Sequence, residues 1–118
     1  MNEKIFKDRT KKLAIAILRL VEEMPRSISA DVLARQIVRS GTSIGANYRA
    51  ACRAKSTADM INKLKIVEEE SDETAYWFEL IAEMGYVPQG KTSPLVKETD
   101  EILAMTVASL KTLRSRKA

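Results

Sequence analysis

The chain has 118 residues, a formal net charge of +4, one cysteine and no histidine. This length suits a single hydrophobic core, so residues 1–118 are treated as one domain. The counts exclude an intramolecular disulfide and any histidine-based metal or acid–base site.

The first predicted element is a helix over about residues 4–24. Apolar residues between Phe6 and Met24 recur at the three- and four-residue spacing that marks one buried face of a helix. Pro25 then ends the pattern, because proline disfavours continuation of a helix.

The second predicted element is a helix over residues 29–55, which follows a capping-type residue, Ser27. Gly41 and Gly45 interrupt its apolar stripe, and each glycine costs roughly 1 kcal/mol relative to alanine inside a helix. Many neighbouring side chains are also small, which would let another helix approach closely. A local break near Thr42 is the alternative; close packing is the interpretation we favour.

Two further helices are predicted in the second half of the chain. A continuous helical pattern covers residues 58–84 and ends at Gly85, a typical C-cap glycine. The pair Ser93-Pro94 is typical of an N-cap followed by a first-turn proline, which predicts a fourth helix over residues 94–115. No segment alternates convincingly as a β-strand.

The predicted architecture is all-α. Long helices joined by short connections favour antiparallel neighbours, so we predict an up-down-up-down four-helix bundle. No apolar run approaches the roughly 20 residues that a membrane span needs, and the N-terminus lacks the apolar core of a signal peptide. We therefore expect a cytoplasmic protein that does not bind membranes.

Positive charge is concentrated in the first half of the sequence. Residues 1–58 carry twelve Lys/Arg and five Asp/Glu, whereas residues 59–118 carry eight and eleven. Projection of the second helix places four arginines on one face, namely Arg35, Arg39, Arg49 and Arg53. Such a ridge suits a nucleic-acid backbone or an acidic surface of another subunit, and four independently solvated arginines are the simpler alternative. With basic residues of the first helix, the candidate nucleic-acid-binding residues are Lys11, Lys12, Arg19, Arg35 and Arg39.

Glu70 and Glu73 lie on a broad apolar face of the third helix, next to the only tryptophan, Trp77. A buried carboxylate is usually paired, because an isolated buried charge is unfavourable, and the breadth of this face suggests a contact between subunits. The candidate partners are Asn47, Arg49 and Arg53. A catalytic carboxylate pair is the alternative, but the chain has no evident nucleophile, and a di-iron site needs Glu-x-x-His pairs. We predict a structural polar cluster, no catalysis, and no cofactor or metal.

The segment Gly85-Tyr-Val-Pro-Gln-Gly-Lys-Thr92 fits the phosphate-loop pattern of nucleotide-binding proteins. That loop requires a strand before it and a helix after it, whereas a helix precedes this segment. Pro88 also removes one of the N–H donors. The segment is therefore interpreted as a turn between two helices.

Three stretches carry a resemblance to a known family. They are Ser43-Ile-Gly-Ala-Asn-Tyr-Arg-Ala-Ala-Cys-Arg-Ala-Lys-Ser, Asp59-Met-Ile-Asn-Lys-Leu-Lys-Ile and Glu70-Ser-Asp-Glu-Thr-Ala-Tyr-Trp-Phe-Glu-Leu. The chain resembles the bacterial four-helix bundle proteins related to those encoded by intervening sequences in large-subunit ribosomal RNA genes. Ala50 and Glu69 depart from the family pattern. With the residues above, the resemblance gives a candidate interface cluster of Ser43, Asn47, Arg49, Arg53, Glu70, Glu73 and Trp77.

The resemblance implies a bundle that assembles into a homopentameric ring without known enzymatic activity. Similar proteins include an accessory factor of diversity-generating retroelements, which binds nucleic acid and partners a reverse transcriptase. Two functions are therefore predicted as alternatives. One is a non-catalytic oligomer that binds the RNA or DNA backbone through a basic surface, and the other is a protein–protein scaffold that binds no nucleic acid.

Overall fold

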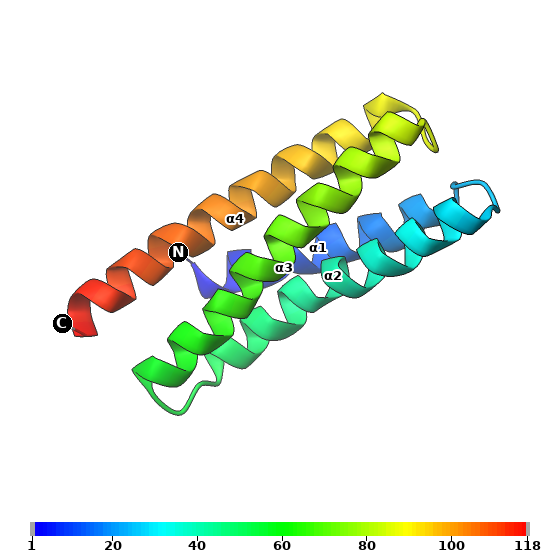
Figure 1. Ribbon diagram of the computed structural model, residues 1–118. Helices are drawn as coiled ribbons and strands as arrows, with labels where there is room; N and C mark the ends of the chain where they lie inside the picture. The colour runs from blue at the N-terminus through cyan, green and yellow to red at the C-terminus, as the bar shows by residue number, and fades with distance from the viewer. Residues whose placement is uncertain (1, 118) are drawn as a thin grey trace.

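The structure is a computed structural model that describes residues 2–117, and no strand occurs within this range. Its four helices are α1 (Glu3–Val21), α2 (Ile28–Cys52), α3 (Thr57–Met84) and α4 (Gln89–Lys117) (Figure 1). They form an elongated molecule of 48 × 22 × 21 Å. The chain is therefore all-α, as predicted, and its arrangement is consistent with a four-helix bundle.

The first three helices begin at polar capping residues. The side chains of Asn2, Ser27 and Ser56 each accept a hydrogen bond from a backbone N–H in the first helical turn. Gly85 ends α3 with a left-handed φ of 68°, a conformation that glycine adopts without a steric penalty. These caps place the ends of α1 to α3 within a few residues of the predicted positions.

The predicted start of α4 is wrong, because the helix begins at Gln89 and contains Pro94. Proline has no N–H, so Pro94 cannot donate to the carbonyl of Gly90 one turn earlier. This loss is confined to one hydrogen bond near the helix start. The side chains of Thr92 and Ser93 both donate to the carbonyl of Gln89, which stabilises the first turn.

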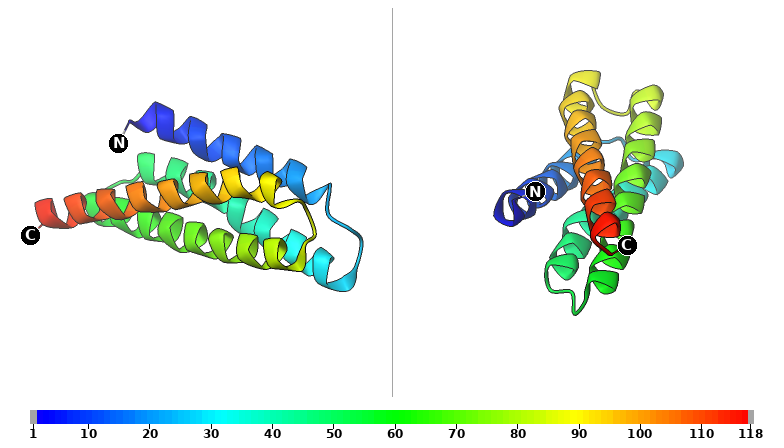
Figure 2. Two further views of the ribbon diagram at one scale, coloured as in Figure 1. Left: turned by 90° about the horizontal axis from the view of Figure 1, so that it is seen from above. Right: turned by 90° about the vertical axis from the view of Figure 1, so that its left-hand side faces the viewer.

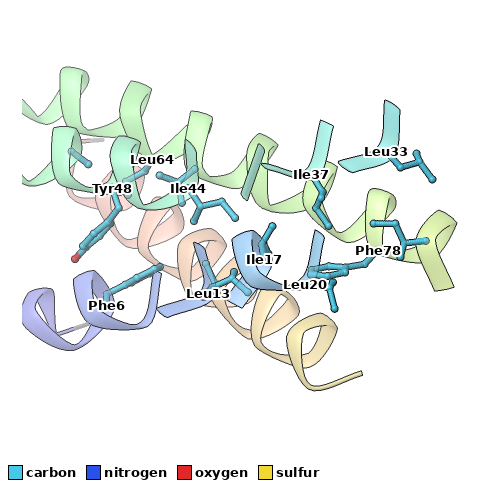
Figure 3. Close-up of a cluster of buried hydrophobic side chains, with 14 of the residues drawn as sticks. Phe6, Leu13, Ile17, Leu20, Leu33, Ile37, Ile44, Tyr48, Leu64 and Phe78 are labelled. Atoms are coloured by element: carbon cyan, nitrogen blue, oxygen red, sulfur yellow. The ribbon is translucent and has the colours of Figure 1, made fainter. Parts of the chain in front are cut away.

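The core is a continuous apolar cluster drawn from all four helices (Figure 3). Each helix contacts the next along the chain, and α1 also contacts α4. The aromatic ring of Phe6 stacks on that of Tyr48, with centroids 4.4 Å apart and 16° between the planes. No helix in the described part of the chain combines the length and hydrophobicity that a membrane span requires.

Close packing explains the two mid-helix glycines. A Cβ added at Gly41 would lie 2.5 Å from Cδ1 of Ile17, and one added at Gly45 would lie 3.1 Å from Oγ1 of Thr10. The favoured interpretation is thus confirmed, since α2 is continuous from Ile28 to Cys52 without a break. Later residues of α1 meet earlier residues of α2, so the two helices run in opposite directions.

The termini of all four helices are grouped at the two ends of the molecule. The N-terminal parts of α1 and α3 lie with the C-terminal parts of α2 and α4 at one end, as the colours in Figures 1 and 2 show. The other end carries the connection between α1 and α2 and the connection between α3 and α4. Residues from distant parts of the sequence are therefore brought together at each end.

Candidate functional site

Arg39 pairs with the two glutamates that the sequence placed on the apolar face of α3. Its guanidinium donates to Glu73 at 2.7 Å and lies 3.9 Å from a carboxylate oxygen of Glu70. Beside this pair, the hydroxyl of Thr74 donates to that of Ser40 at 2.8 Å, and both side chains are fully buried. A polar cluster of Arg39, Ser40, Glu70, Glu73 and Thr74 therefore lies across the contact between α2 and α3.

The predicted partners of Glu70 and Glu73 are wrong within one chain. Asn47 donates to the backbone carbonyl and the hydroxyl of Ser43, at 2.9 and 2.8 Å, so its amide stays on α2. Arg49 and Arg53 form no ion pair with either glutamate in the part of the chain described. Arg39, which was predicted to bind nucleic acid, makes the contact instead.

The register of α2 against α3 explains this error. Helical projection gives the angle at which a side chain leaves the axis but not its height along the axis. Arg39 and Glu73 are level, whereas Arg53 lies about 20 Å farther along α2 at 1.5 Å per residue. Arg53 is the C-cap residue of α2 and therefore lies near the start of α3, far from Glu73.

Two buried polar atoms in this region have no hydrogen-bond partner among the described residues. They are Oε2 of Glu70 and Nε1 of Trp77. Burial raises the pKa of the Glu70 carboxyl, and the negative charge of Glu73 adds to this effect. The positive charge of Arg39 lowers that pKa, but it does not outweigh burial.

The five predicted nucleic-acid-binding residues do not form one cluster. All five are exposed on α1 and α2. Lys12 pairs with Asp8 at 3.0 Å, and Arg39 pairs with Glu73. Within residues 2–116, the remaining three, Lys11, Arg19 and Arg35, form no ion pair.

Folding separates the charges along the length of the molecule. The half that holds both chain ends consists of residues 2–12, 43–70 and 103–116, and carries thirteen Lys/Arg against six Asp/Glu, a formal charge of +7. We call it the basic half. The other half, residues 13–42 and 71–102, carries six Lys/Arg against ten Asp/Glu, a formal charge of −4, and is the acidic half. Lys11 and Lys12 lie in the basic half, whereas Arg19, Arg35 and Arg39 lie in the acidic half.

Most cations of the basic half are available to bind an anion. Considering only side chains that the structure describes, those without an ion pair are Lys4, Lys11, Arg49, Arg53, Lys55, Lys63, Lys65, Lys111, Arg114 and Arg116. All are exposed except Lys63, which is half-buried. The last three come from α4, which the sequence analysis had left out of the basic surface.

Arg9 is a structural residue that the sequence analysis missed. Its guanidinium donates to Glu98 through two nitrogens, at 2.5 and 2.9 Å, and contacts Glu101 at 3.0 Å. These bonds join α1 to α4. The hydrogen bond from Arg9 lowers the pKa of the Glu98 carboxyl despite its partial burial.

The segment that resembles a phosphate loop has a structural role. Gly85 caps α3, Gln89 begins α4, and Lys91 pairs at 3.1 Å with Glu23, which lies in the connection between α1 and α2. The preceding element is a helix, so the segment lacks the strand that a phosphate loop requires. Only residues 85–88 form the connection between the helices, because Gln89 to Thr92 belong to α4. Among the described residues, no group of three or more cysteine, aspartate or glutamate side chains could hold a metal ion.

Comparisons with known proteins identify a family and a similar solved structure. The profile of the 23S rRNA-intervening sequence protein family matches residues 3–108. A crystal structure of a protein of unknown function, from the S23 ribosomal protein family of Bacteroides thetaiotaomicron, is similar with a TM-score of 0.86 and 36% sequence identity. The similarity covers 94% of this chain and 99% of that chain. No curated protein matches the chain.

Proposed function

Because the chain belongs to the 23S rRNA-intervening sequence protein family, which has no established activity, we propose a function from the charge of its surface. In this proposal the protein is a non-catalytic oligomer that binds the RNA or DNA backbone through its basic half. The observation that carries this proposal is the separation of charge along the molecule. A cluster of unpaired Lys and Arg attracts a polyanion, and each phosphate that it neutralises releases bound counterions.

The proposed binding surface excludes three of the five residues that were first predicted to bind nucleic acid. Arg39 already neutralises Glu73, and Arg19 and Arg35 lie in the acidic half, where a polyanion is repelled. Lys11 and Lys12 remain part of the proposed surface. Arg49, Arg53, Lys111, Arg114 and Arg116 are added to it.

The oligomer in this proposal is an up-down-up-down bundle assembled into a homopentameric ring in the cytoplasm. Support comes from the family resemblance and from exposed apolar side chains on α2 and α3, such as Val32 and Met84. A ring would place several basic halves within reach of one nucleic acid. Several weak contacts would then act together and raise the overall affinity.

Binding is tested by fluorescence anisotropy with labelled RNA and DNA over roughly 50 to 200 mM salt. The decisive variants are Arg49→Ala with Arg53→Ala in the basic half, and Arg19→Ala with Arg26→Ala in the acidic half. Each pair removes two exposed arginines, of which only Arg26 has an ion-pair partner among the described side chains, Asp31 at 3.5 Å. The first pair should weaken binding about tenfold and lower the salt slope by about 2, and the second should change affinity less than about twofold.

Two outcomes would contradict the proposal. Absence of any salt-sensitive complex with the wild-type protein would reject nucleic-acid binding. A loss confined to the Arg19 and Arg26 pair would place the binding site in the acidic half. Comparison of RNA with DNA in the same series shows which polymer is preferred.

A protein–protein scaffold is the second candidate function, with a protein such as a reverse transcriptase as its partner. The exposed apolar residues Ile28, Val32, Tyr76 and Met84 favour it, because exposed apolar patches mark protein contacts. This function predicts that the wild-type protein forms no salt-sensitive complex with nucleic acid. The binding series above therefore separates the two functions.

A further inference from the structure

An apolar patch lies on the outer side of the contact between α2 and α3, in the acidic half. We define it by Ile28, Val32, Trp77, Leu80 and Met84. Ile28 is 89% exposed, Met84 57% and Val32 48%. Trp77 and Leu80 are half-buried against the core. A hydrogen bond between the hydroxyls of Ser29 and Tyr86 joins the start of α2 to the residues just after α3, which keeps the parts of the patch together.

Unpaired polar atoms lie beside the same patch. Nε1 of Trp77 and Oε2 of Glu70 are buried without a hydrogen-bond partner among the residues described. Such atoms are unfavourable in a folded protein unless another molecule pairs with them. A half-buried tryptophan next to exposed aliphatic side chains is also a frequent centre of binding energy in protein interfaces.

A groove with complementary properties lies on another side of the molecule, between α3 and α4. Its volume is about 630 Å³, and its lining includes the apolar residues Phe78, Ala82, Val96 and Ala104. The carboxylates of Glu79 and Asp100 also line it. Neither forms an ion pair with another described residue. Ala82 and Trp77 lie roughly 140° apart around α3, so the groove and the patch face different directions.

We propose that the apolar patch of one copy packs into the α3/α4 groove of a neighbouring copy. The proposal rests on the oligomer proposed above and names the two surfaces that build it. Ile28, Val32 and Met84 supply apolar groups for the groove. Arg35, which is exposed beside the patch and has no ion pair within the described chain, complements Glu79 and Asp100 at the groove.

The contact joins two different surfaces, so it is heterologous and leaves a free patch and a free groove at the ends of any open chain of copies. Closure of such a chain gives a ring, whereas a contact between two identical patches would stop at a dimer. The acidic halves are then covered, and the basic halves remain open to solvent.

The test measures native mass by light scattering for wild type and for two variants that damage one surface each. Val32→Glu places a charge in the patch, and Ala104→Trp fills the groove; both positions are exposed, and circular dichroism verifies their helicity. Each variant should have the mass of one chain, 13.2 kDa. A mixture of the two should give twice that mass, since one intact patch and one intact groove remain. Leu18→Glu, at an exposed position of α1, is the matched control and should retain the wild-type mass.

The outcomes separate this interface from the proposed function. A wild-type protein with the mass of one chain would reject both the oligomer and the interface. An oligomer whose mass is unchanged in Val32→Glu and in Met84→Glu would reject the interface alone. Failure of the mixture to form a pair would show that the two surfaces do not contact each other.

Discussion

Gly41 of α2 lies directly against Ile17 of α1, close enough that a Cβ on the glycine would be 2.5 Å from Cδ1 of the isoleucine. Ile17 is fully buried, so its side chain has little room to move (Figure 3). Glycine is unfavourable inside a helix, yet here it lets two backbones approach. The packing gained between α1 and α2 offsets the lower helix propensity.

The first prediction concerns this contact. Gly41→Ala should destabilise the protein by about 1–3 kcal/mol, because overpacking outweighs the gain of roughly 1 kcal/mol in helix propensity. In the Ile17→Val background, which lacks Cδ1, the same substitution should be neutral or stabilising. Urea unfolding of the four proteins of this cycle measures the coupling. Equal effects of Gly41→Ala in both backgrounds would show that the contact does not limit the packing.

The number, type and order of the helices were predictable from the sequence because each helix repeats its apolar spacing over many turns. The start of α4 was not, since Ser93-Pro94 has the residue types of an N-cap and first-turn proline although it lies inside the helix. The stretch before it contains Gly90 and Pro88, which also disfavour a helix. Thr92 is almost fully buried, so its tertiary packing stabilises the first turn of α4 although the local helix propensity is low.

The position of charged groups was only partly predictable. Projection gives the face of α2 on which Arg39 lies, but its pairing with Glu73 depends on the register between helices, which periodicity does not contain. Arg9 shows the same limit, because its partners Glu98 and Glu101 are on the last helix. The basic half likewise depends on which helix ends meet, so a division of the sequence into two consecutive halves did not reveal it.

The second prediction concerns the ion pair between Arg9 and Glu98. The pKa of the Glu98 carboxyl is lowered from its ordinary value of 4.5, so its stabilising effect is present above that value and is lost as the pH falls through the lower folded pKa. Glu98→Gln should therefore reduce the free energy of unfolding by about 1 kcal/mol at pH 7 and by much less near pH 3. Urea unfolding at both pH values measures the difference.

The matched control for this prediction is Glu101→Gln. Glu101 makes a single contact with Arg9 and its side chain is 50% exposed, compared with 29% for Glu98. Its removal should have a smaller effect, and one that salt screens more strongly. A loss in Glu98→Gln that is the same at both pH values would contradict an electrostatic role for the carboxylate.

The third prediction concerns Glu70, whose ionisation has the opposite effect on stability to that of Glu98. Burial and the charge of Glu73 raise the pKa of the Glu70 carboxyl, so ionisation destabilises the folded chain as the pH rises above 4.5 and through the higher folded pKa. Glu70→Gln should stabilise an isolated chain by roughly 1 kcal/mol at pH 7, and the gain should disappear below about pH 4. Because the prediction is for an isolated chain, unfolding is measured at a dilution at which light scattering gives the mass of one chain, or in the Val32→Glu variant. Asp72→Asn, at an exposed position of the same helix, should show no such change.

The fourth prediction concerns the thiol of Cys52 at the end of α2. Burial raises its pKa above the ordinary 9.0, and the nearby Glu3 carboxylate adds to the shift, so less reactive thiolate is present at pH 8. Labelling of the native protein with a thiol-specific disulfide reagent should be at least about tenfold slower than labelling in denaturant. Glu3→Gln should raise the native rate, and Glu22→Gln, at the far end of α1, should leave it unchanged. A native rate equal to the denatured rate would mean that Cys52 is neither shielded nor affected by Glu3.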